Sequence, residues 1–124
     1  MARILVVDNE PTCLKLATTM LAKAGHETLS AVDGAQAIEI ALAQAPELIL
    51  MDIAMPGMDG VEALKRLRAD PRTAGIKVAA LTAYAIRGER ERLLAEGFDD
   101  YLDKPIRYQD FSAQVEAILA RKID

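Results

Sequence analysis

Four apolar segments of this sequence each end at a side chain that could take part in chemistry. The run before Asp52 reads Leu-Ile-Leu-Met, and other apolar runs precede Asp8, Thr82 and Lys104. A carboxylate at the end of a buried strand is costly to desolvate unless another group compensates. For Asp52 alone, a structural carboxylate that binds the amides of the following loop is an equal alternative. Two acids, a hydroxyl and an amine in corresponding places indicate a site.

Carboxylates that crowd together at such a site repel one another, by about 4 kcal/mol for a pair ~4 Å apart at an effective dielectric of about 20. A hard divalent cation relieves this repulsion, and Mg²⁺ suits a partly hydrated site with oxygen ligands. The amine of Lys104 relieves it from the other side. An aspartate, a metal, a hydroxyl and an amine are what phosphoryl transfer to a carboxylate requires. In that chemistry Asp52 is the nucleophile.

The spacing of apolar residues predicts how these side chains are positioned. Short apolar runs alternate with segments of helical periodicity, and Gly or Pro separates most of them. Five strands alternating with five helices imply right-handed crossovers and an α/β fold, with a parallel sheet covered on both faces. The carboxyl ends of parallel strands share one edge, where ligands bind in open sheets. We expect strands at about 3–8, 27–32, 48–51, 76–81 and 101–102, and helices at about 11–24, 35–45, 60–69, 87–96 and 108–118.

The composition is that of an ordinary globular domain. The 124 residues are 52% hydrophobic and 27% charged, and the net charge of −4 argues against binding nucleic acid. No apolar run approaches the ~20 residues that span a membrane, so no membrane association is expected. The start of the chain runs at once into a strand-like segment, so no signal peptide is expected. The single Cys13 excludes an internal disulfide and fits a cytoplasmic location.

Four motifs together resemble the receiver domain of two-component response regulators. The resemblance covers essentially the whole chain, residues 1–124, as one domain, with the motifs in the family's order and spacing. It implies a flavodoxin-like fold, with a parallel sheet in the order 2-1-3-4-5, and a function in two-component phosphorelay signal transduction. Single-domain regulators and receivers of hybrid kinases are the most similar members. The motifs are Asp8-Asn9-Glu10-Pro11, Asp52-Ile53-Ala54-Met55-Pro56-Gly57-Met58-Asp59-Gly60, Leu81-Thr82-Ala83 and Tyr101-Leu102-Asp103-Lys104-Pro105.

The resemblance implies a phosphoacceptor with supporting residues. Asp52 would accept a phosphoryl group from a histidine kinase or a histidine phosphotransfer protein. Thr82 and Lys104 would contact that group, and Tyr101 would turn inward with Thr82 as a switch that alters a face for a downstream protein partner. The bond between Lys104 and Pro105 is expected to be cis. Such a chain is not an enzyme but a phosphoacceptor that supports its own Mg²⁺-dependent phosphorylation and dephosphorylation.

Mg²⁺ is the cofactor that the resemblance implies. Its ligands would be Asp8, Asn9, Asp52 and the backbone carbonyl of Ala54. The family usually has acids at both positions after the first strand, whereas the second one here is Asn9. An amide oxygen can bind Mg²⁺ but brings no charge. We therefore expect Asn9 to weaken metal binding and to leave the fold unaffected.

Three other functions use parts of the same pattern. A haloacid-dehalogenase-type phosphatase needs a second acid two residues after its aspartate, where this chain has Ala54. A flavodoxin-type FMN binder needs a phosphate loop rich in Ser, Thr and Gly after the first strand, and the acids at 8 and 10 would repel that phosphate. A pseudo-receiver that acts by protein contact without phosphorylation is the strongest alternative. Asn9 favours it, whereas the intact Asp52, Thr82 and Lys104 oppose it.

Residues outside the proposed phosphoacceptor and metal site have simpler expectations. His26 follows a helix-ending glycine and is expected to be solvated, and Cys13 is expected to be a small packing residue. Ile86, Leu93 and Leu94 are expected to anchor the very polar fourth helix. Tyr84 is expected to shield the phosphoryl group from water, which would slow its hydrolysis.

Overall fold

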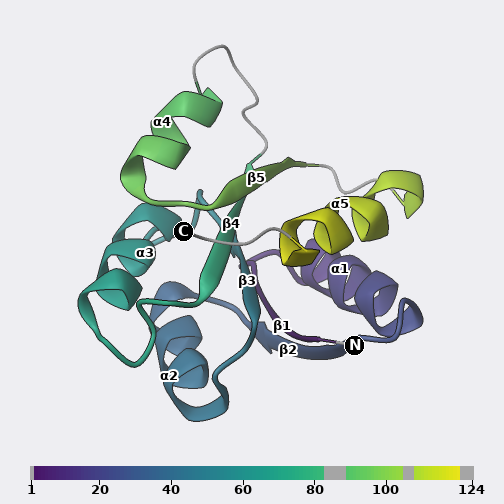
Figure 1. The fold of residues 1–124 in the computed structure, drawn as a ribbon, viewed down its shortest axis with the longest axis horizontal. Coiled ribbons are helices and arrows are strands. Elements are labelled where there is room, and N and C mark those ends of the chain that lie inside the picture. Colours follow the sequence, from purple (N-terminus) through teal and green to yellow (C-terminus); the bar gives the residue numbers. More distant parts are fainter. Residues whose placement is uncertain (1, 83–88, 105–107, 121–124) are drawn as a thin grey trace.

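The computed structural model describes residues 2–82, 89–104 and 108–120 of the chain. Within these residues, five strands alternate with five helices, as the sequence pattern predicts, and Figure 1 shows their arrangement. The strands are β1 (Arg3–Val7), β2 (Glu27–Ala31), β3 (Leu48–Asp52), β4 (Lys77–Thr82) and β5 (Asp100–Asp103). The helices are α1 (Pro11–Lys23), α2 (Gly34–Gln44), α3 (Gly60–Ala69), α4 (Glu89–Glu96) and α5 (Tyr108–Ala120).

The five strands form one parallel sheet in the order β2-β1-β3-β4-β5. All five residues of β3 are buried, as expected for a central apolar strand covered on both faces. The register places Val7 beside Met51 and Asp52 beside Leu81. The carboxyl ends of β1, β3 and β4 therefore lie at the same edge. The predicted flavodoxin-like fold and its strand order are confirmed.

Two layers of helices enclose this sheet. α1 and α5 pack on one face, and α2, α3 and α4 lie on the other (Figure 1). Successive strand residues point to opposite faces, so Leu50 joins the core beneath α1 and α5, whereas Met51 joins the core on the other side. In the part of the chain that the structure describes, no helix is long and apolar enough to cross a membrane.

Two local expectations are wrong. Leu93 of α4 is fully buried, but its neighbour Leu94 is 39% exposed, because adjacent helical residues point in different directions. His26 is buried instead of solvated. Its Nδ1 accepts a hydrogen bond from the Ala2 backbone N–H at 3.1 Å, and its Nε2 lies 2.6 Å from Oε1 of Glu116. The imidazole therefore links the residue before β1 to α5, a contact across 90 residues of sequence.

Candidate functional site

Strand alternation brings the chemically active side chains to one place. A residue two positions beyond a core residue in an extended chain points to the same face of the sheet. Asp8, Asp52 and Lys104 each follow by two positions a residue of the core beneath α1 and α5. Thr82 instead follows Ala80, which belongs to the core on the other face, so Thr82 approaches from that side. The three core residues are Val6, Leu50 and Leu102.

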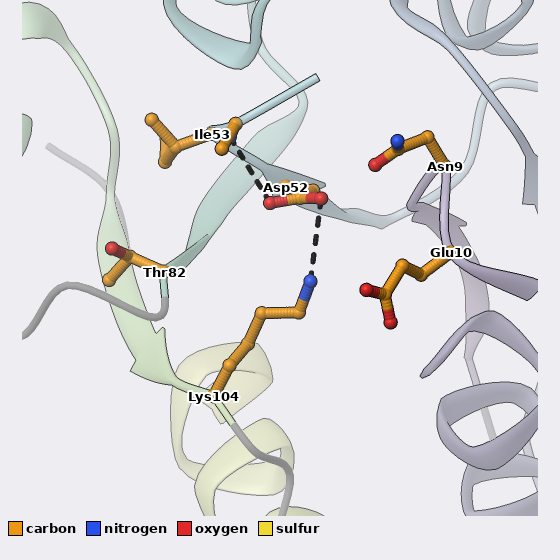
Figure 2. Close-up of a pocket in the computed structure, with 7 residues that line it drawn as sticks. Asn9, Glu10, Asp52, Ile53, Thr82 and Lys104 are labelled. Carbon is orange, nitrogen blue, oxygen red and sulfur yellow. Dashed lines mark hydrogen bonds and ion pairs between the residues drawn. The ribbon is translucent and has the colours of Figure 1, made fainter. Parts of the chain in front are cut away.

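Lys104 joins the two carboxylates. Its Nζ lies 2.8 Å from Oδ2 of Asp8 and 3.4 Å from Oδ2 of Asp52, and Figure 2 shows the side chain extending to Asp52. Asp8 is 1% exposed and Asp52 4% exposed, so both charges are largely removed from water. The backbone N–H of Lys104 donates to the carbonyl of Thr82 at 2.7 Å, which fixes where the lysine leaves β5.

The protonation equilibria reflect this crowding. Burial, followed by the charge of Asp8, raises the pKa of Asp52, although Lys104 and the hydrogen bond from Ala54 act in the opposite direction. Burial on its own lowers the pKa of Lys104, but the contact with Asp8 and the charges of both carboxylates outweigh it and raise that pKa. Lys104 is therefore firmly cationic at neutral pH and favours the ionised form of Asp52.

Backbone groups hold the other oxygen of each carboxylate. The N–H of Glu10 donates to Oδ1 of Asp8 at 2.9 Å, and the N–H of Ala54 donates to Oδ1 of Asp52 at 3.2 Å. The loop after Asp52 is closed by the N–H of Gly60, which donates to the carbonyl of Ile53 at 3.1 Å. Both Oδ2 atoms are thereby left facing Lys104. The sequence indicated the turn at Gly60 but not this hydrogen bond, which brings the start of α3 against the end of β3.

A cavity of about 220 Å³ opens in front of Asp52. This is several times the ~30 Å³ that a water molecule occupies in the liquid, so a hydrated ion or a phosphoryl group has room. Figure 2 shows the side chains of Asn9 and Glu10 on one side of this space and that of Thr82 on the other. The cavity is lined by Asn9, Glu10, Asp52, Ile53, Ala54, Thr82 and Lys104.

The donor set at this cavity fits Mg²⁺. Oδ2 of Asp8 is buried and has no hydrogen-bond partner among the described residues, although it forms an ion pair with Lys104 at 2.8 Å. Asp8 is not among the residues that line the cavity, and it adjoins the cavity through Lys104. This Asp8 oxygen, Asp52, the Asn9 amide and the Ala54 carbonyl are all hard oxygen donors. In the described part of the chain, no group of three or more His, Cys, Asp or Glu side chains is placed to hold a metal ion. The ion would therefore keep several waters, as Mg²⁺ does.

Tyr101 lies apart from this group of residues. It is half-buried in β5, paired with Ala80 of β4, and packs against the core beneath α2, α3 and α4. It does not line the cavity in front of Asp52. Its expected role as a switch is not tested by this position. Tyr84, Ile86 and Pro105 lie outside the described residues. The shielding role, the helix anchor and the cis bond that the resemblance implies therefore stay predictions.

Comparisons with known proteins agree on one family. A family model described as the response regulator receiver domain matches residues 4–116. Protein PilH of Pseudomonas aeruginosa is 37% identical over 120 residues, which make up 97% of this chain and 99% of PilH. The transcriptional regulator RpaA of Synechocystis is 38% identical over 121 residues, and this chain spans only about half (50%) of its length.

Solved structures give the same result. The receiver domain of the sensor histidine kinase PA1611 from P. aeruginosa superimposes with a TM-score of 0.86 and 32% identity. The match covers 97% of this chain and 98% of that domain, which has a magnesium ion coordinated in its active site cleft. The fold therefore has a counterpart among solved structures.

Proposed function

We propose, because this chain belongs to the response regulator receiver domain family, that Asp52 accepts a phosphoryl group in two-component signalling. The donor would be a phosphohistidine on a histidine kinase or a histidine phosphotransfer protein. The position of Asp52 is the observation that carries the proposal. Its carboxylate is buried at the base of a cavity, 3.4 Å from the ammonium of Lys104.

In the transfer, a carboxylate oxygen of Asp52 forms a bond to phosphorus while the bond from phosphorus to the donor imidazole nitrogen breaks. The imidazole leaves with the electron pair of that bond and takes up a proton from solvent. Lys104 can neutralise charge on the phosphoryl oxygens, and Thr82 lines the cavity where its hydroxyl can donate to them. The Ala54 N–H keeps the attacking carboxylate oriented.

The family and the donor set support Mg²⁺ as the cofactor. Asp8, Asn9, Asp52 and the Ala54 carbonyl would hold the ion, which would supply positive charge toward the phosphoryl oxygens. The magnesium ion in the PA1611 receiver domain is consistent with this assignment.

Phosphorylation of Asp52 would change a protein-interaction face, with Thr82 and Tyr101 as the switching residues, and a downstream protein would recognise the change. The chain would act in the cytoplasm as a phosphoacceptor that supports its own dephosphorylation, without being an enzyme. Relatives such as the sensor protein GacS of Pseudomonas syringae, of which this chain spans 12%, carry such a domain within a much longer chain.

A pseudo-receiver is the second candidate function. Asn9 favours it, because an uncharged residue at the cavity weakens the attraction for a dication. The intact acceptor, hydroxyl and amine around the cavity favour phosphorylation instead. Whether the protein takes up phosphate separates the two candidates.

The test is incubation with acetyl phosphate and Mg²⁺, followed by intact-mass measurement. We expect the wild-type chain to gain the mass of one phosphoryl group and Asp52→Asn to gain none. Asp59→Asn is a matched control, because Asp59 lies in the same loop and caps α3, where asparagine is an equally good N-cap. An unmodified wild type would establish the pseudo-receiver, and equal modification of Asp52→Asn would remove Asp52 as the acceptor.

A further inference from the structure

We infer that the carboxylate of Glu10 supplies to the cation site the negative charge that the neutral Asn9 does not provide. The inference rests on the proposed function, because it concerns the same Mg²⁺ site. Asp8 and Asp52 bring two negative charges, and Lys104 lies against both of them. One net negative charge therefore remains to balance a dication. The neutral amide of Asn9 faces the cavity without changing that balance.

Glu10 borders the cavity and does not cap the backbone of the helix that it precedes. It occupies the N-cap position of α1, where a side chain can accept hydrogen bonds from the first turn, but it makes no such bond. Instead it lines the cavity, and Figure 2 shows its carboxylate pointing across that space toward Lys104. Glu10 is therefore the third charged residue that lines the space, together with Asp52 and Lys104.

Two contacts keep this carboxylate near the cavity. The backbone N–H of Glu10 donates to Oδ1 of Asp8 at 2.9 Å, which ties Glu10 to a metal-ligand candidate. The Cys13 thiol lies 3.4 Å from Oε2 of Glu10 and donates to it. Burial, reinforced by this contact, raises the pKa of Cys13, so the thiol keeps its proton. The expected packing role of Cys13 thus includes a polar contact.

The remaining oxygen of the carboxylate can act on a cation. Oε1 of Glu10 has no hydrogen bond from the residues that the structure describes, and the residue is exposed to solvent. Since no three acidic side chains of the described residues are grouped as metal ligands, it can act on the ion through one of the bound waters. Glu10, Asp52 and Lys104 line the cavity, and Asp8 is paired with Lys104, so these four residues together carry two net negative charges, which matches a dication.

The size of the effect follows from Coulomb's law. One unit charge ~5 Å from a dication in a water-like dielectric corresponds to roughly a tenfold change in the dissociation constant. Glu10→Gln should therefore weaken Mg²⁺ binding about tenfold. Asn9→Asp should strengthen it, and Asn9→Asp combined with Glu10→Gln should return it close to wild type.

The experiment is calorimetric titration of the full chain with MgCl₂ at constant ionic strength, for wild type, the two single variants and the double variant. Glu39→Gln is the matched control, because Glu39 is an exposed carboxylate on α2 that does not line the cavity. Thermal melts in EDTA verify that each variant is folded, which we expect because Glu10 is exposed and caps nothing.

A loss confined to Glu10→Gln, with recovery in the double variant, supports the inference. Equal affinity in Glu10→Gln and Glu39→Gln overturns it, as does a double variant that remains as weak as Glu10→Gln. The proposed function fails by a different readout, the absence of a phosphoryl group on wild type in the intact-mass experiment. A chain that is phosphorylated normally but binds Mg²⁺ equally well without Glu10 refutes only the present inference.

Discussion

Gly60, the first residue of α3, is expected to tolerate no side chain. A Cβ there would lie 2.4 Å from the carbonyl oxygen of Asp52 and 2.9 Å from Cα of Ile53. Both neighbours are backbone atoms at the end of β3, a strand whose residues are all buried. They have no rotamer by which to move aside. Gly60→Ala must therefore displace either the start of α3 or the end of β3.

Two opposing effects set the magnitude. Replacing glycine by alanine inside a helix ordinarily stabilises it by up to about 1 kcal/mol. Forcing an extra methyl group into a well-packed place costs typically about 1–3 kcal/mol. Because the close contact of the added methyl group is with backbone, the cost lies in the upper part of this range of about 1–3 kcal/mol. The gain in helix propensity is smaller than usual because Gly60 lies at a helix terminus. We expect a net loss of roughly 2 kcal/mol. The displaced carboxylate should also weaken Mg²⁺ binding.

Urea unfolding in EDTA measures the loss, and Gly75→Ala is the matched control. A Cβ at Gly75 would meet no atom within 4 Å, so the same substitution there should change the free energy of unfolding little. Gly34→Ala is a graded case, since its nearest neighbour is the flexible Met58 side chain at 2.9 Å. If Gly60→Ala is as stable as Gly75→Ala, the close approach to Asp52 is not a packing constraint and the reasoning is refuted.

Three further substitutions test the site and the fold. Because burial and then the charge of Asp8 raise the pKa of Asp52, the folded chain holds that proton more tightly than the unfolded chain does. The free energy of unfolding of the metal-free chain should therefore fall as the pH rises above the ordinary aspartate pKa of about 4. Urea unfolding at several pH values measures this fall, and Asp52→Asn should remove it. Lys104→Met should lower the metal-free stability by roughly 3–5 kcal/mol, because it leaves two buried carboxylates without their cation. Thermal melts should show MgCl₂ restoring much of the loss. His26→Ala should lower the free energy of unfolding, measured with urea, by about 1–3 kcal/mol, because it leaves a backbone N–H and Glu116 without their partner. The Mg²⁺ affinity of this variant, measured by calorimetry, should be unchanged.

The location of the site could be predicted because it depends on short-range rules. An acid directly after a continuous apolar run is visible in the sequence, and parallel strands bring their carboxyl ends together. Those two facts place Asp8, Asp52, Thr82 and Lys104 at one edge. The two-residue alternation of extended chain then accounts for the convergence of both acids and the lysine.

Other features depend on contacts that no local pattern records. The burial of His26 requires Glu116, which is 90 residues away and on another helix. The constraint at Gly60 appears only when the start of α3 is placed against β3. Leu94 shows a different limit, since two adjacent apolar residues on a short polar helix cannot both face the core, and periodicity alone does not choose between them.

The electrostatics of Asp52 connect the stability of the fold with its reactivity. In the proposed transfer, a carboxylate that burial and Asp8 make less stable as an anion would be a stronger nucleophile than one in water, because less solvation must be lost before attack. Lys104 opposes protonation of Asp52, because its ammonium lies 3.4 Å from the carboxylate and favours the anion. Oδ1 of Asp52 is held by the Ala54 N–H while Oδ2 faces Lys104, so charge and orientation are controlled by different groups. The four apolar residues that precede Asp52 in β3 are fully buried, and their packing offsets the cost of holding this charge at the end of the strand.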